Sequence, residues 1–157
     1  MYQNILVPLD GSELAECVLP HLESIAKGCG VKNIIFVNFS EPPHIPIYGA
    51  DGDIFIAEDF KRLEQESGTI AEKYLNHLVS RVKYDGVNIQ SEVLSGGRAA
   101  DVIADYATKC EADLIIIATH GRSGISRWVW GSVADRILRS ACVPVMMVRA
   151  PGCVPGI

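Results

Sequence analysis

The sequence lacks any long apolar run: across its 157 residues, none approaches the ~20 residues that a helix needs to cross a bilayer. It also has no internal repeat and no low-complexity stretch. Met1 is followed at once by a strand-like segment, without a basic leader or a cleavage site. These absences predict a soluble cytoplasmic protein with no signal peptide and no membrane partner.

Positive charge is scarce, because 14 Lys and Arg residues stand against 19 Asp and Glu, giving a formal net charge of −5. A negative surface repels the phosphate backbone, so we expect no nucleic-acid partner. A single nucleotide remains possible. A few main-chain N–H groups and one arginine at contact distance outweigh a diffuse negative field.

The five cysteines show no C-x-x-C spacing, so we expect neither a metal site nor a disulfide among them. Four of them fall in or beside predicted helices, where a thiol packs as a small apolar group. Cys153, in the tail rich in proline and glycine, is expected to be the only exposed one.

Strand-like apolar segments alternate with helical segments along the chain. The strands are predicted at residues 4–8, 33–39, 88–94, 114–119 and 143–148, and helices lie between them. This alternation predicts an α/β fold, a parallel sheet sandwiched by helices. We expect one domain over residues 1–150 and a flexible tail over 151–157.

Two local features carry further expectations. Pro20 lies inside the first predicted helix, which begins after Ser12, and should bend it. Residues 40–57 are predicted to be an irregular loop, followed by a helix over Glu58–Tyr84. Its inner face is predicted to hold seven residues: Leu63, Ile70, Ala71, Tyr74, Leu75, Leu78 and Val82.

Two loops are candidates for a ligand site, because ligands of open parallel sheets bind beyond the carboxyl ends of strands where strand order reverses. Asp10-Gly11-Ser12 follows the first strand, and residues 119–132 follow the fourth. If these strands are neighbours, the Asp10 carboxylate could hold a ribose hydroxyl or a Mg²⁺ ion that bridges phosphates. Asp10 is also explained as a turn and capping carboxylate, so both interpretations stay open.

The second loop has the composition of a phosphate cradle. Gly121 and Gly124 permit close backbone approach, and a helix predicted to start at Gly131-Ser132 offers the N–H groups of its first turn, that of Val133 included. Arg122 could pair with phosphates. His120 could act as a base, yet no nucleophile with a paired acid is evident, so a structural role in the turn is favoured.

Four segments in combination resemble the universal stress protein family over nearly the full chain. They read I-L-V-P-L-D-G-S, V-L-S-G-G-R, D-L-I-I-I-A-T-H-G-R-S-G and G-S-V-A-D-R-I-L-R-S-A-C-V-P-V-M-M-V. The resemblance implies a five-stranded parallel open sheet of order 3-2-1-4-5, of the adenine nucleotide alpha-hydrolase-like type. In one branch of the family it also implies ATP binding.

That branch carries the loop pattern G-x-x-G, nine residues, then G-S or G-T. Gly121 and Gly131-Ser132 fit the pattern, whereas Ala118 replaces the first glycine. The resemblance implies that Asp10 lies near the ribose and phosphates and that the main chain of Phe39 contacts adenine. The implied nucleotide-binding residues are Pro8, Leu9, Asp10, Phe39, Ala118, Thr119, His120, Gly121, Arg122, Gly124, Gly131, Ser132 and Val133.

The sequence therefore predicts a regulatory or stress-response protein that binds ATP with Mg²⁺, or AMP or ADP, with little or no turnover. Two alternatives stay open: a slow ATPase, and a dimeric interaction module that binds no nucleotide, which Ala118 and the 40–57 loop favour. A homodimer is expected through the last strand, Val145–Val148, because an apolar sheet edge is normally covered. The resemblance implies the same pairing.

Overall fold

The computed structural model describes residues 1–41, 53–119 and 132–149, which form five strands and five helical segments. The expected tail at 151–157 lies outside this part of the chain. In chain order the elements are β1 (Asn4–Pro8), the 3₁₀ helix η1 (Ala15–Val18), α1 (Leu19–Cys29), β2 (Asn33–Ser40), α2 (Asp53–Arg81), β3 (Asn88–Ser95), α3 (Ala99–Lys109), β4 (Leu114–Ala118), α4 (Ser132–Ser140) and β5 (Val145–Val148).

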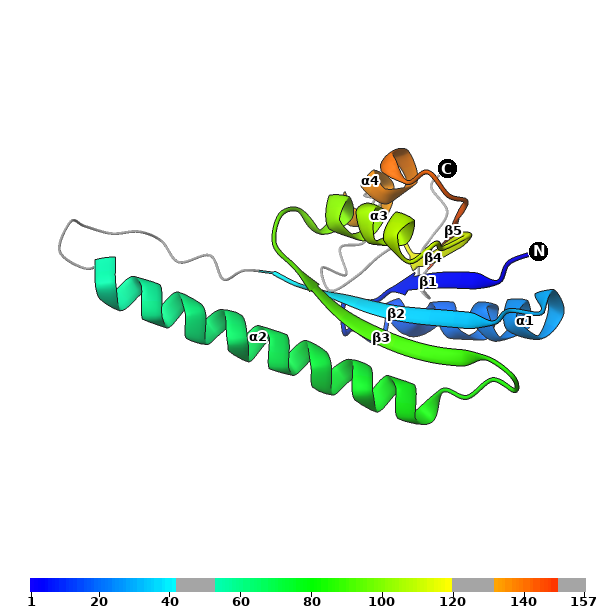
Figure 1. The fold of residues 1–157 in the computed structure, drawn as a ribbon, viewed down its shortest axis with the longest axis horizontal. Coiled ribbons are helices and arrows are strands. Elements are labelled where there is room, and N and C mark those ends of the chain that lie inside the picture. The colour runs from blue at the N-terminus through cyan, green and yellow to red at the C-terminus, as the bar shows by residue number, and fades with distance from the viewer. Residues whose placement is uncertain (42–52, 120–131, 150–157) are drawn as a thin grey trace.

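All strand pairs are parallel, and the sheet has the order β3-β2-β1-β4-β5, as Figure 1 shows. The predicted α/β class and strand order are confirmed. β1 and β4 read as continuous apolar runs, and such runs suit strands that are covered on both faces. The structure buries every residue of β4 and all but the first of β1.

Helices cover the two faces of the sheet in pairs, with α1 and α2 on one face and α3 and α4 on the other (Figure 1). Because successive strand side chains point to opposite faces, Ile5 and Val7 join the α1–α2 core and Leu6 joins the α3–α4 core. None of the helices in the described part of the chain combines the length and apolar character that crossing a bilayer requires.

Asparagines tie the amino ends of three neighbouring strands together. The Asn88 amide donates to Asn33 Oδ1 at 3.2 Å, and the Asn33 amide donates to Asn4 Oδ1 at 2.8 Å. The three residues lie opposite one another in the sheet register. A slip of any of these strands would break the row, so the row favours the observed register.

Pro20 does not lie in the interior of a helix, contrary to the prediction. The segment after Ser12 begins with the 3₁₀ helix η1, and α1 starts only at Leu19, so Pro20 falls in the first turn of α1. First-turn N–H groups have no intrahelical partner, and a proline there removes no helix hydrogen bond.

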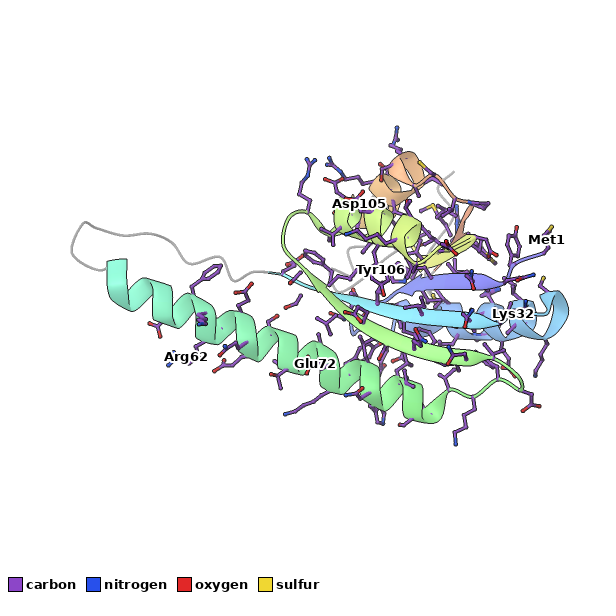
Figure 2. All side chains as sticks on the ribbon, viewed as in Figure 1. Met1, Lys32, Arg62, Glu72, Asp105 and Tyr106 are labelled. Atoms are coloured by element: carbon purple, nitrogen blue, oxygen red, sulfur yellow. The ribbon has the colours of Figure 1, made fainter. Side chains whose placement is uncertain are left out.

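The helix expected at Glu58–Tyr84 begins earlier and ends earlier, at Asp53 and Arg81, so the irregular segment predicted for residues 40–57 is shorter than expected. Residues 42–52 lie outside the described part of the chain. Figure 1 shows the N-terminal half of α2 projecting past the carboxyl ends of the strands, and Figure 2 places Arg62 on this half, far from Lys32 beside the amino end of β2.

This projection explains why part of the predicted inner face of α2 is exposed. Ala71, Leu75 and Leu78 are buried as predicted, but Leu63 has no strand beneath it and is 38% exposed. Ile70 is 65% exposed because it is rotated by about 100° from Ala71 on the helix. The amphipathic pattern correctly predicted the buried face of the helix, but it could not predict how far the sheet extends beneath that face.

The thiols of Cys17, Cys29, Cys110 and Cys142 are free. Burial raises the pKa of Cys17 and of Cys110, which keeps both thiols protonated and unreactive. Cys142, beyond the end of α4, is exposed, so the expectation that only Cys153 would be exposed is wrong. Cys153 lies outside the described residues.

Two glycines at the end of α1 should respond to alanine in opposite directions. Gly28 lies within the helix, and Gly30 follows it in the left-handed region at φ +67°; neither position has an atom within 4 Å of an added Cβ. Gly28→Ala should stabilise the fold by about 0.5–1 kcal/mol, and Gly30→Ala should destabilise it by about 1–2 kcal/mol. Urea unfolding measures both, and equal changes would contradict the left-handed end of α1.

Candidate functional site

The strand order reverses between β1 and β4 at the centre of the sheet (Figure 1). From β1 the chain proceeds outward to β2 and β3, then returns to place β4 on the other side of β1. Registered pairs between these two fully described strands stop at Leu6–Ile115, whereas β1 pairs with β2 as far as Pro8–Val37. The carboxyl ends of β1 and β4 thus form the kind of reversal where open parallel sheets bind ligands.

The exit of β1 is held firmly against β2. Leu9 is buried, and its main-chain N–H donates to the Val37 carbonyl at 2.8 Å. Its carbonyl accepts from the side-chain amide of Asn38 at 3.0 Å. Both main-chain polar groups of Leu9, the residue that precedes Asp10, are therefore fixed by β2, and this determines where the Asp10 turn begins.

Asn38 is a residue that the sequence interpretation missed. It is 4% exposed, and an unpaired donor at such a buried position would be costly. The signal was present in the second strand, N-I-I-F-V-N-F, as a single amide near the end of an apolar run. Its hydrogen bond to Leu9 could not be predicted from that signal, because the contact exists only once β1 pairs with β2.

Asp10 closes the turn that leads into η1. One carboxylate oxygen, Oδ1, accepts from the Ser12 N–H at 3.0 Å and from the Ser12 hydroxyl at 2.6 Å. The Ser12 hydroxyl accepts in turn from the N–H of Ala15, the first residue of η1, at 3.2 Å. Gly11 between them has φ +84°, a value that glycine adopts without strain. The turn role of Asp10 is confirmed, and Oδ1 accepts both bonds from Ser12.

The exit of β4 is paired with β5. Ala118 and Thr119 are buried, and the Thr119 N–H donates to the Val148 carbonyl at 2.8 Å. This amide pairs with β5 and is not available to an anion, so a donor cradle cannot begin at Thr119. The expected contacts at His120, Gly121, Arg122, Gly124 and Gly131 lie outside the described residues.

α4 begins at Ser132, as predicted. Ser132 is exposed, and Val133 packs on the α3–α4 side of the sheet together with Phe39 of β2. The first N–H groups of an α-helix have no intrahelical partner and carry a partial positive charge. The structure therefore places donors suited to an anion at the start of α4, after the loop that leaves β4.

A charged bridge links α4 to α3, and the sequence interpretation did not anticipate it. Asp101 accepts from Arg98 Nε at 2.7 Å and from Arg136 Nε at 3.0 Å. Desolvation alone would raise the pKa of Asp101, but hydrogen bonds from Arg136 and Arg98 lower it. The turn Ser95-Gly96-Gly97-Arg98 opens α3, with Arg98 at its N-cap.

The described residues also bear on metal binding, which requires ligating side chains that lie close together. Within residues 1–41, 53–119 and 132–149, no group of three His, Cys, Asp or Glu side chains converges as a protein-held metal would require. Mg²⁺ usually keeps several waters and takes one or two carboxylates together with substrate phosphates. Asp10 suits only that arrangement, as one ligand to an ion already bound to phosphates.

A family model described as the universal stress protein family matches residues 1–149. The chain belongs to this family. Universal stress protein MJ0531 of Methanocaldococcus jannaschii is 32% identical over 153 residues, which cover 96% of this chain and 84% of that protein. Universal stress protein G of Salmonella typhimurium is 28% identical over 151 residues, which cover 95% of this chain and all of that one.

Solved structures of the family share the fold of this universal stress protein. The hypothetical protein MJ0577 superposes with a TM-score of 0.72 at 22% identity, covering 97% of this chain and 99% of that one. UspA of Lactobacillus plantarum gives a TM-score of 0.68 at 22% identity, covering 94% and 98%. A universal stress protein in complex with cAMP gives 0.55 at 19% identity, covering 95% and 98%.

The link from Asn38 to Leu9 yields a prediction about stability. Asn38→Leu keeps the volume but leaves the buried Leu9 carbonyl without its donor, so the free energy of unfolding should fall by about 1–3 kcal/mol. Asn76→Leu, at an exposed position on α2, is the matched control and should change it by less than about 0.5 kcal/mol. Similar losses in both variants, measured by urea unfolding, would contradict the role of Asn38.

Proposed function

We propose that this universal stress protein binds an adenine nucleotide at the carboxyl ends of β1 and β4, in a cytoplasmic regulatory or stress-response role. The observation that carries the proposal is the reversal of strand order at these two strands. It brings the Asp10 turn, at the exit of β1, next to the carboxyl end of β4, the strand that precedes α4 in the chain. A carboxylate and helix N-terminal donors are the two groups that a ribose phosphate requires.

The choice of adenine nucleotide is supported by the family. One universal stress protein has been solved in complex with cAMP, although at 19% identity its likeness to this chain shows only the shared fold. For this chain we propose ATP, with ADP and AMP as alternatives. Pro8 and Leu9 would form the wall of the base pocket, and the main chain of Phe39 would contact the adenine.

The phosphates would lie against the start of α4. Because the Thr119 N–H pairs with β5, the proposed donors are the N–H groups of Ser132 and Val133, together with residues of the preceding loop. Mg²⁺, when bound to the phosphates, would neutralise part of their charge. Asp10 would orient that ion or hold a ribose hydroxyl, from a position fixed by Ser12 and by β2.

Binding rather than catalysis is proposed because the sequence offers no nucleophile with a paired acid or base. Slow hydrolysis remains an alternative, and phosphate release above that of a mock purification would favour it. Substitution of Asp10 is the sharpest test of nucleotide binding, because the charge of its side chain can be removed while its turn is retained.

Asp10→Asn should weaken Mg-ATP binding by roughly ten- to a hundredfold, the loss of one charge-assisted interaction. The asparagine Oδ1 can still accept from Ser12, so the turn should persist. Affinity for ATP without metal should be unchanged or higher, because a carboxylate no longer repels the phosphates. Isothermal titration of nucleotide-free protein, with and without Mg²⁺, measures both.

Glu13→Gln is the matched control, since it removes an exposed carboxylate three residues away and should leave both affinities unchanged. Absence of heat from the wild-type protein at millimolar nucleotide would end the proposal. It would favour the alternative of an interaction module that binds no nucleotide.

We also propose that the chain forms a homodimer through the edge of β5. Val145, Met146 and Met147 are partly exposed in a strand that ends the sheet of the described residues. The carbonyls of Pro144 and Val148 accept from β4, so by the alternation of a parallel ladder the N–H groups of Val145 and Met147 point to the open edge. A second copy could pair with these groups.

Met147→Pro should convert the dimer to a monomer, because it removes one outward N–H without breaking the ladder to β4. Met147→Leu keeps that N–H and should remain dimeric. Light scattering coupled to size exclusion at micromolar protein distinguishes the two states. A monomeric wild-type protein would contradict the proposed pairing.

A further inference from the structure

Glu16 joins two elements that are distant in the sequence and meet beside the Asp10 turn. Its carboxylate accepts from the Tyr74 hydroxyl at 3.1 Å and pairs with the Arg81 guanidinium, both on α2. The Glu16 side chain is only 19% exposed. Two donors on one mostly covered carboxylate are worth more than an ordinary surface ion pair, since water screens them less.

Glu16 is the chain neighbour of Ala15, and hydrogen bonds lead from Ala15 through Ser12 to Asp10. The Glu16 N–H donates to the Glu13 carbonyl at 3.2 Å, which closes the first turn of η1. The Ala15 N–H donates to Ser12, at 3.2 Å to its carbonyl and to its hydroxyl. Ser12 in turn donates twice to Asp10 Oδ1. A displacement of Glu16 would therefore move Ala15, whose N–H is bonded to the residue that holds Asp10 Oδ1.

η1 depends on such anchors because it has only four residues. A 3₁₀ segment of this length has weak hydrogen-bond geometry and does not hold its position without packing. Its apolar residues Ala15 and Val18 are buried under the sheet, which fixes one side. The side toward α2 is fixed by the polar contacts of Glu16.

The pKa of Tyr74 reflects its proximity to Glu16 and Asp10. Burial first, then the charge and hydrogen bond of Glu16, and then the charge of Asp10, raise its pKa far above that of free tyrosine. The hydroxyl therefore stays protonated and remains a donor to Glu16 throughout the physiological range. That Asp10 contributes places Tyr74 within electrostatic range of the proposed nucleotide site.

We infer that Glu16 is a positioning residue: held by Tyr74 and Arg81 of α2, it fixes η1 and thereby sets the position of the Asp10 turn at the carboxyl ends of β1 and β4. The effect on nucleotide affinity rests on the proposed function, whereas the effect on the turn does not. Both can be measured separately on the full chain.

Amide hydrogen exchange tests the effect on the turn without any nucleotide. Exchange of the Ser12 and Ala15 amides is compared with that of the Phe36 amide, which lies in the core and follows global opening. In Glu16→Ala the two turn amides should lose about tenfold in protection relative to Phe36, the equivalent of one charge-assisted hydrogen bond. Tyr74→Phe, which removes only the hydroxyl, should give a smaller loss in the same direction.

Glu16→Gln retains an acceptor for Tyr74 and should restore part of the protection. Glu23→Ala is the matched control, because Glu23 pairs only with Lys27 along α1 among its described contacts, and it should leave the ratio unchanged. Unaltered protection ratios in both Glu16→Ala and Tyr74→Phe overturn the inference, whatever the protein binds.

Titration with ATP tests the consequence for the site. Glu16→Ala should weaken Mg-ATP binding more than metal-free ATP binding, because a misplaced Asp10 affects the metal-dependent part. A merely destabilised fold would weaken both equally, and that result, or no change in a binding wild-type protein, overturns the inference. If the wild-type protein binds no nucleotide, the proposed function fails and the exchange ratios alone decide on Glu16.

Discussion

The parallel contact between β1 and β4 organises the rest of the molecule. Each strand must leave its carboxyl end toward a different helix, since β1 continues into η1 and β4 precedes α4. Their exits diverge on opposite faces of the sheet, and registered pairing stops before the strands end. The strands that lead to these exits are buried, β4 at every residue and β1 at all but its first.

The two ends of the sheet are built differently. At the amino ends, the Asn88 amide donates to Asn33 and the Asn33 amide donates to Asn4, so side-chain hydrogen bonds join the three strands. At the carboxyl ends, polar side chains are used to hold exits in place: Asn38 holds Leu9, and Ser12 holds Asp10. These bonds are buried or partly buried, and they hold the exit of β1 in place.

The two halves of α2 lie at different distances from the exit of β1. Its C-terminal half packs on the sheet through Leu75 and Leu78 and meets η1 through Tyr74 and Arg81. Its N-terminal half projects beyond the strands (Figure 1). A single rigid helix thus connects the proposed nucleotide site with a surface outside the α/β sandwich.

The sequence by itself determined the class of fold, the strand positions to within about two residues, and Asp10 and the start of α4 as candidates, because apolar periodicity and turn chemistry are local. Local sequence patterns could not predict which side chains and main-chain groups far apart in the chain would pair. That the Thr119 amide is taken by β5, that Asn38 serves Leu9 and that Glu16 meets α2 were decided only by tertiary structure. A donor's partner depends on which strands and helices become neighbours, and this follows from packing the whole chain rather than from any local pattern.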